Sequence, residues 1–295
     1  MARDSGIPWT DGTINSLVGC SKVSAGCKNC YATAGVWRMV SNPMFCRDGV
    51  NPYEGLVQQR PERGALNWTG RISFVPARLQ AVLKVRKPKR YFVDSLSDLF
   101  HSEVSIEIIL DHFRLFRAAH WHQFQILTKR SDRLLDMSDL IQWPDNVWMG
   151  VSVENAKPGI LDRIADLGKT GARIRWVSFE PWLSEDNPLR AMQPGLRPIL
   201  ESAGVAWAVI GGESSRDKES ARYLAVDDVR YLIEECRAVG VKVFLKQLGT
   251  RWAIASNTYS LKGADGSRLK KINAGGAPEF WPADFRDASL REYPV

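Results

Sequence analysis

The sequence predicts an α/β fold with a single (β/α) barrel, partial or complete, of about six to seven parallel strands. From residue 90 onward, short apolar runs rich in β-branched and aromatic residues alternate with amphipathic stretches. This alternation is typical of repeated βαβ units, whose strands lie parallel in one sheet. Polar side chains follow most of the runs, at the end where parallel barrels carry their active sites. A doubly wound open sheet is the structural alternative, because alternation alone fits both folds.

The elements can be assigned in chain order. The first predicted strand ends where a group of cysteines begins, and most later strands are followed by a segment of helical periodicity. The predicted strands are 14–18, 90–94, 123–128, 147–152, 174–178, 207–211 and 242–246. The predicted helices are 76–85, 105–119, 131–140, 159–167 and 226–239.

We expect residues 1–250 to form the barrel and residues 251–295 to form a C-terminal cap or extension. Residues 37–70 interrupt the strand–helix rhythm and are rich in Pro, Gly, Asn and Arg. They therefore predict a long loop inserted over one end of the barrel. The C-terminal part is punctuated by Gly and Pro and shows little periodicity.

The composition is that of a globular protein with a sizeable core, since 44% of the 295 residues are hydrophobic. Neither a membrane-spanning run nor the apolar core of a signal peptide is visible, so we expect a cytoplasmic protein without a membrane partner. A net charge of +7, with a basic run at residues 84–90, favours a polyanionic partner such as nucleic acid. The alternative for the basic run is a solvated helix end. The oligomeric state is not predicted.

Three of the five cysteines, Cys20, Cys27 and Cys30, form a C-x6-C-x2-C motif directly after the first predicted strand. Such close spacing indicates metal or redox chemistry rather than a disulfide framework. Three thiolates on one loop can bind three irons of a [4Fe–4S] cluster and leave the fourth iron open. The alternative is a structural zinc site with Cys46 as the fourth ligand.

The sequence resembles the phage Gp37/Gp68 family, also called three-Cys-motif proteins. The resemblance covers residues 7 to 250 in order. It is carried by residues 18–32, 51–55, 68–70, 92–101, 125–130, 148–155, 209–214 and 244–247.

That family looks like a divergent branch of the radical S-adenosylmethionine (SAM) enzymes, similar to spore photoproduct lyase-like enzymes. The resemblance implies that Cys20, Cys27 and Cys30 bind a [4Fe–4S] cluster and that SAM is the second cofactor. The six-residue first spacing departs from the three residues of those relatives, and implies a longer first half of the cluster loop. The expected cofactor-binding residues are Tyr31, Ser95, Ser97, Asp98, Thr128, Lys129, Ser152 and Glu154.

Within that set, Ser97 and Asp98 resemble the residue pair that holds the SAM amino group in those relatives, and Lys129 resembles the lysine that pairs with the SAM carboxylate. Glu180, Glu213 and Lys246 follow later strands, and we expect them to contact substrate and move protons. The alternative for these three is ordinary salt bridges at the strand ends.

The expected substrate is a nucleic-acid base, such as a hypermodified thymine in phage DNA, flipped out of the helix. The enzyme would then be an isomerase, a lyase or a base-modifying transferase, with a flavodoxin- or ferredoxin-type electron donor. One alternative is a radical SAM enzyme acting on a peptide or small metabolite. Another is a non-catalytic, zinc-stabilised protein that binds nucleic acid. Salt-dependent DNA binding and metal content separate these possibilities.

Overall fold

The computed structural model describes residues 6–46, 49–59, 66–184, 195–215, 217–259 and 274–294. The chain divides into two compact units. The first comprises Met1–Gly150 with Thr170–Arg173, and the second comprises Val151–Lys169 with Ile174–Val295.

Seven strands form one sheet in which the strand order follows the sequence. They are β1 (Gly12–Ile14), β6 (Arg90–Val93), β7 (Gln123–Thr128), β8 (Val147–Ser152), β9 (Ile174–Phe179), β10 (Val205–Gly211) and β11 (Lys242–Gln247). The pairs β1–β6, β6–β7, β9–β10 and β10–β11 are parallel. A doubly wound sheet reverses its strand order at a switch point, whereas this order runs in one direction from β1 to β11. The prediction of a partial (β/α) barrel is therefore confirmed.

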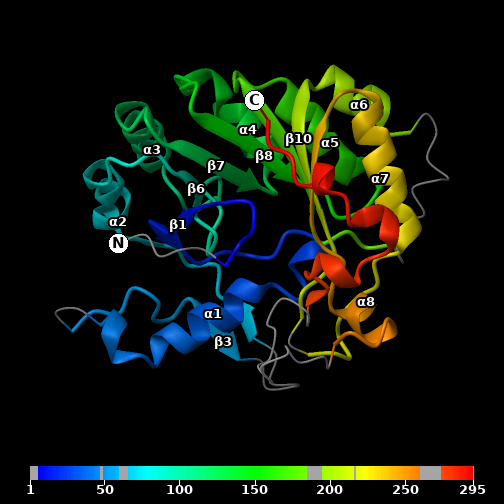
Figure 1. The fold of residues 1–295 in the computed structure, drawn as a ribbon. Coiled ribbons are helices and arrows are strands. Elements are labelled where there is room, and N and C mark those ends of the chain that lie inside the picture. Colours follow the sequence, from blue (N-terminus) through cyan, green and yellow to red (C-terminus); the bar gives the residue numbers. More distant parts are fainter. Residues whose placement is uncertain are drawn as a thin grey trace. The chain divides into compact units, whose positions relative to one another are not determined.

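In the first unit, the helices follow their strands as the periodicity predicts (Figure 1). They are α2 (Pro76–Gln80, continued by a 3-10 turn at Ala81–Lys84), α3 (Ile106–Ala118) and α4 (Ser131–Met137). The side chain of Ser105 caps α3 by accepting a hydrogen bond from the amide of Ile108. The buried residues of α3 recur every three to four positions, and Phe116 stacks on Phe124 of β7.

The first predicted strand, 14–18, is wrong as one element. β1 ends at Ile14, and Leu17–Val18 (β2) pairs antiparallel with Ser73–Phe74 (β5). The polar residues Asn15 and Ser16 end β1 because their side chains hold the chain in a turn. The Asn15 Oδ1 accepts hydrogen bonds from the Ser95 hydroxyl and the Leu96 amide, at 3.0 and 3.1 Å.

Asp94, directly after β6, fixes the other half of this turn. Its Oδ1 accepts from the Leu17 amide at 2.9 Å and from the Ser16 hydroxyl at 3.1 Å. The same hydroxyl lies 2.8 Å from Nε2 of His112, whose Nδ1 donates to the Ile108 carbonyl. Burial raises the pKa of Asp94 to about 7 and lowers that of His112 to about 4. The buried cluster therefore favours the neutral form of each side chain.

The stretch 37–70, expected to be a long loop, contains regular structure. It begins within α1 (Tyr31–Val40), continues through a 3-10 turn at Pro43–Phe45, and includes the antiparallel pair β3 (Val57–Gln59) and β4 (Leu66–Trp68). Helix α1 lies beside β3 (Figure 1). These elements bury a small core of their own, formed by Val18, Ala32, Val36, Tyr53, Leu56, Val57, Trp68 and Leu96. Cys20 and Cys30 pack against this core, so the segment supports the cysteine loop.

The second unit carries α5 (Pro158–Gly168), α6 (Arg197–Ser202), α7 (Val226–Ala238) and α8 (Thr250–Ala255). The described C-terminal residues form α8 and three 3-10 turns, and the tail packs on the sheet. Phe244 of β11 forms an antiparallel bridge with Arg291, and the Trp207 indole donates to the Glu292 carbonyl at 2.9 Å. Among the described residues, every helix is too short or too polar to cross a bilayer.

The Asp94 cluster gives a stability prediction. We expect Asp94→Ala to lower the free energy of unfolding by about 2–4 kcal/mol, because the buried Leu17 amide and Ser16 hydroxyl lose their acceptor. Asp94→Asn keeps the Oδ1 acceptor, so we expect it to cost less than about 1.5 kcal/mol. Urea denaturation of both variants measures the difference. Equal stabilities would contradict the role given to Asp94.

Candidate functional site

The three motif cysteines lie on one loop between β2 and α1. Cys20 follows β2 closely, Cys27 ends a 3-10 turn at Ala25–Cys27, and Cys30 is the N-cap residue of α1. All three are free thiols and partly buried. The loop lies at the carboxyl edge of β1, β6 and β7, because the residues that hold it follow the ends of these strands.

Gly19 is required at the start of the loop. Its φ is +103°, and a Cβ at this position would lie 2.1 Å from the Arg71 carbonyl oxygen. Its amide donates to the Leu96 carbonyl at 3.1 Å, and its own carbonyl accepts from the Ser97 hydroxyl at 2.7 Å. Ser95 and Ser97 were predicted to bind cofactor, but their hydroxyls donate within the protein. The Ser97 hydroxyl donates to the Gly19 carbonyl, and the Ser95 hydroxyl donates to the Asn15 side chain.

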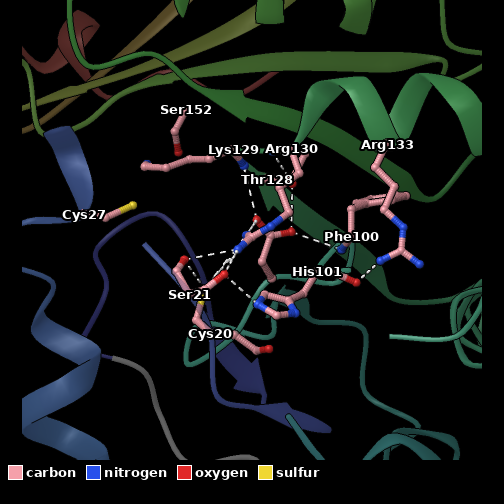
Figure 2. A network of polar contacts seen from close by, with 12 residues as sticks. Cys20, Ser21, Cys27, Phe100, His101, Thr128, Lys129, Arg130, Arg133 and Ser152 are labelled. Atoms are coloured by element: carbon pink, nitrogen blue, oxygen red, sulfur yellow. Dashed lines mark hydrogen bonds and ion pairs between the residues drawn. The ribbon is translucent and has the colours of Figure 1, made fainter. Parts of the chain in front are cut away.

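Figure 2 shows the polar network around Thr128 and Arg130, and the Asp98 carboxylate accepts hydrogen bonds from both side chains. One oxygen accepts from the Thr128 hydroxyl at 2.7 Å and from the Phe100 amide at 3.0 Å. The other accepts from Nη1 of Arg130 at 2.7 Å and from the Lys129 amide at 3.3 Å. Asp98 and Thr128, both predicted to bind SAM, therefore contact each other and Arg130.

Arg130 and His101 both reach the cysteine loop. Nη2 of Arg130 donates to the carbonyl and the hydroxyl of Ser21, at 3.1 and 2.9 Å, and the guanidinium lies 3.9 Å from Sγ of Cys20. Nδ1 of His101 accepts from the Glu103 amide, so Nε2 carries the proton and donates to the Ser21 hydroxyl at 2.8 Å. Burial, together with the nearby Arg130, lowers the pKa of His101, and the ring is neutral at pH 7.

Burial dominates the protonation of two of the thiols. It raises the pKa of Cys20 to about 12, even though the Arg130 charge acts in the opposite direction. It also raises the pKa of Cys30, against hydrogen bonds from the amides of Ala32 and Thr33 and from the Trp68 indole. Without a metal both are thiols at neutral pH, and metal binding must release their protons.

The donor set fits an iron–sulfur cluster in ligand type and number. Three free thiols on one partly buried loop are the ligands that leave one iron of a cubane open. The three sulfurs do not form a ready-made metal site, since no group of three or more His, Cys, Asp or Glu in the described part of the chain is arranged to hold a metal. Cys46, the alternative zinc ligand, follows the 3-10 turn at Pro43–Phe45 and is exposed.

Two of the predicted carboxylates in the second unit are buried and paired with arginines. Glu154 lies 2.9 Å from Nη1 of Arg163, which also donates to the carbonyl of Ser152 at the end of β8. Glu213 accepts from the amide and the guanidinium of Arg222. These contacts tie neighbouring segments of the second unit together.

Glu180 and Lys246 form a more accessible pair, with 2.9 Å between Oε1 and Nζ. Glu180 directly follows β9, and Lys246 is the penultimate residue of β11. Gly211, the last residue of β10, lies beside the Glu180 carboxylate. A Cβ on Gly211 would lie 2.6 Å from Oε1, and one on Gly212 would lie 2.5 Å from the Leu248 carbonyl. The two glycines of the Gly-Gly-Glu sequence are therefore explained by close packing.

Two further predicted residues, Tyr31 and Lys129, differ in their exposure. The Tyr31 ring is 58% exposed, and its hydroxyl donates to the Ser95 carbonyl at 2.9 Å. The Lys129 side chain is partly buried, and within the described part of the chain its ammonium takes no hydrogen bond or ion pair. Sequence reasoning missed Arg130 and Ser21 as site residues. The position of Arg130, directly after Thr128 and Lys129, was the available signal.

Residues 4–277 match the family model described as "Protein of unknown function (DUF5131)". The chain belongs to this family. The DUF5131 match includes the cysteine loop and every predicted site residue. The likeness to phage Gp37/Gp68 proteins stays a resemblance. Among curated proteins, none matches the chain significantly.

Solved structures similar to this DUF5131 protein include three of spore photoproduct lyase. A point mutant has 12% identity and a TM-score of 0.47, covering 82% of this chain and 78% of that chain. A complex with dinucleoside spore photoproduct has 12% identity and a TM-score of 0.45, covering 81% and 75%. A mutant with bound AdoMet and the dinucleoside has 11% identity and a TM-score of 0.43, covering 80% and 63%.

Gly19 gives a prediction about the loop. In Gly19→Ala, the Cβ must displace the Arg71 backbone, so we expect Cys20 to become more accessible and to react several times faster with iodoacetamide. Gly240→Ala is the matched control, because Gly240 also has a positive φ of 76° but faces open space. Peptide mass spectrometry of the alkylated proteins measures the rates. Identical Cys20 labelling in wild type and Gly19→Ala would contradict the steric requirement.

Proposed function

We propose that the protein is a radical SAM enzyme whose [4Fe–4S] cluster is held by Cys20, Cys27 and Cys30. The observation that carries the proposal is the loop itself, with three free thiols in a C-x6-C-x2-C motif at the carboxyl edge of parallel strands. Cys30 is the N-cap residue of α1, and the first amides of the helix donate to its sulfur, although burial raises its pKa overall. When bound, such a cluster supplies the electron that cleaves SAM reductively to a 5′-deoxyadenosyl radical.

The contacts suggest a division of roles among the predicted cofactor-binding residues. Lys129 is the cation available to a SAM carboxylate, since its ammonium has no partner among the described residues. The Asp98 carboxylate already accepts four hydrogen bonds, so its proposed role is to hold Thr128 and Arg130. Ser152, at the end of β8, stays a proposed contact of the SAM ribose or carboxylate.

The proposed substrate is a nucleic-acid base. Two surfaces could bind it: the basic run 84–90 and a surface beside the cysteine loop. The basic run 84–90 precedes and begins β6, at the opposite end of that strand from Asp94 and Asp98. Two of its arginines are already engaged, Arg90 with Asp11 and Arg86 over Trp121. This run is therefore not placed to hold a base at the candidate site.

Helix α1 offers the better surface. Tyr31 and Trp37 are 58% and 40% exposed. The spacing of the helix puts Tyr31 and exposed Arg38 on one outward face and Trp37 on the flank of that face. The buried residues Ala32, Thr33 and Val36 occupy the opposite face. Exposed Lys22 and Lys28 lie on the adjoining loop, and no acidic residue occurs from 15 to 46. Aromatic rings among cations are the pattern that binds single-stranded nucleic acid.

The reaction class is proposed as rearrangement or modification of a flipped-out base, for example a hypermodified thymine, by an isomerase, lyase or transferase. Glu180 and Lys246 are proposed as substrate contacts, because a partly accessible carboxylate–ammonium pair can transfer protons. A flavodoxin- or ferredoxin-type protein is the proposed electron donor.

Metal content tests the proposal directly. Anaerobically purified wild type is expected to be brown, with about four irons per chain and a broad absorption band near 400 nm. Dithionite and SAM should then give 5′-deoxyadenosine. A variant carrying Cys20→Ala, Cys27→Ala and Cys30→Ala should be colourless and inactive. One tightly bound zinc in a colourless wild type would refute the proposal and indicate a zinc-stabilised binding protein.

DNA binding tests the substrate class. We expect single-stranded DNA to bind wild type with a strong salt dependence. Trp37→Ala should remove about 1–3 kcal/mol of affinity, and Arg38→Ala should reduce the salt slope by about one phosphate contact. Lys87→Ala, an exposed change in the basic run, is the control that should leave affinity near wild type. Fluorescence anisotropy at several salt concentrations measures all four. Salt-independent or absent binding would favour a peptide or small-metabolite substrate.

A further inference from the structure

Arg130 connects three parts of the first unit through one guanidinium. It stands at the N-cap of α4, directly after β7. Figure 2 shows its side chain reaching from there to Ser21 and Cys20. Nη1 contacts Asp98 at 2.7 Å, Nη2 contacts the carbonyl and hydroxyl of Ser21, and both nitrogens lie 3.9 Å from Sγ of Cys20.

The arrangement requires an arginine. Asp98 and Arg130 have side chains only 7% and 11% exposed, so the pair is largely removed from water. A planar fork can bind a carboxylate with one nitrogen and two oxygens of Ser21 with the other, whereas a lysine ammonium is a point charge. Asp98 is itself fixed by Thr128 and the Phe100 amide, so the guanidinium has a defined orientation.

Ser21 is the first residue of the six-residue stretch that separates Cys20 from Cys27. It is held twice, by Nη2 of Arg130 and by Nε2 of His101, and both donate to its hydroxyl. The later part of the stretch is held locally, through the Cys27 amide donating to the Ser24 carbonyl and through Lys22 Nζ donating to the Lys28 carbonyl. Arg130 and His101 therefore attach the beginning of the long spacing to the strand ends.

We propose that Arg130 is the positioning residue of the cluster loop, and that Asp98 acts through it. Arg130 fixes Ser21, which sets where Cys20 presents its sulfur, and it places a permanent positive charge beside that sulfur. The inference rests on the proposed function, because it takes Cys20 as a cluster ligand. A fixed cation beside a ligand sulfur stabilises the more negative, reduced cluster and raises its reduction potential.

The experiment compares wild type with Arg130→Gln, Arg130→Lys and Asp98→Asn, using Arg90→Gln as the control. Arg90 also pairs with an aspartate, Asp11, but at the opposite end of β6. Three quantities are measured: amide hydrogen exchange of residues 20–25 without metal, the rate of iron loss to a chelator after reconstitution, and the reduction potential by EPR-monitored titration. Circular dichroism verifies that each variant is folded.

In Arg130→Gln we expect faster exchange in residues 20–25, iron loss accelerated by about tenfold or more, and a more negative potential. Arg130→Lys should keep the potential closer to wild type, because the charge remains, but should not restore slow exchange. Asp98→Asn should shift all three quantities in the direction of Arg130→Gln, and Arg90→Gln should match wild type.

The outcomes separate this inference from the proposed function. A wild type that binds iron, together with an Arg130→Gln variant unchanged in exchange, iron loss and potential, would overturn the positioning role and leave the proposed function intact. A wild type that binds no iron would overturn the proposed function and with it the role toward a cluster. Exchange in the metal-free variants would then still decide whether Arg130 holds the loop.

Discussion

The five residues that follow β6 are the constraint on which the rest of the first unit depends. Asp94 accepts from Leu17 and Ser16, and Ser95 donates to Asn15, so these two fix the turn between β1 and β2. The Leu96 carbonyl and the Ser97 hydroxyl hold the two sides of Gly19. Asp98 then orients Arg130 toward Ser21 and Cys20. A single short connection thus positions both ends of the turn and the start of the cysteine loop, which explains why so many of its side chains are polar although largely buried.

Three buried carboxylates, found in both units, are each paired with an arginine that offsets the cost of removing the negative charge from water. Arg130 forms an ion pair with Asp98, Arg163 with Glu154, and Arg222 with Glu213. Asp94 has no arginine beside it among the described residues; burial raises its pKa to about 7, which shifts the carboxyl toward its neutral form, and it accepts hydrogen bonds from Leu17 and Ser16. Removing one partner of such a pair leaves a buried charge unmatched, so these arginines stabilise their units whatever the protein binds. Lys129, Glu180 and Lys246 are less deeply buried than these carboxylates, with all three side chains partly exposed.

Much of the fold could be predicted from the sequence, because the short β-rich segments 123–128 and 147–152 match β7 and β8 in full. The first strand could not, because Asn15 and Ser16 end it through partners about 80 residues away, and no local pattern shows such contacts. The pair β3–β4 was missed because three-residue strands carry too little periodicity to stand out. At the site, the sequence indicates which polar residues follow strand ends but not where each hydrogen bond points. Ser97 and Asp98 are at the predicted edge, yet they bind the loop and Arg130.

The protonation of the thiols suggests why the loop needs support that is independent of any metal. Burial raises the pKa of Cys20 and of Cys30, so neither sulfur carries the negative charge that would draw a cation to the loop at neutral pH. Metal ligation must release these protons, which favours uptake at higher pH and makes assembly slow if the loop is also mobile. Contacts that do not involve the sulfurs, such as Gly19 to Leu96 and Ser21 to His101, can order the loop beforehand. Arg130 does both, because it donates to Ser21 and also lies 3.9 Å from the Cys20 sulfur.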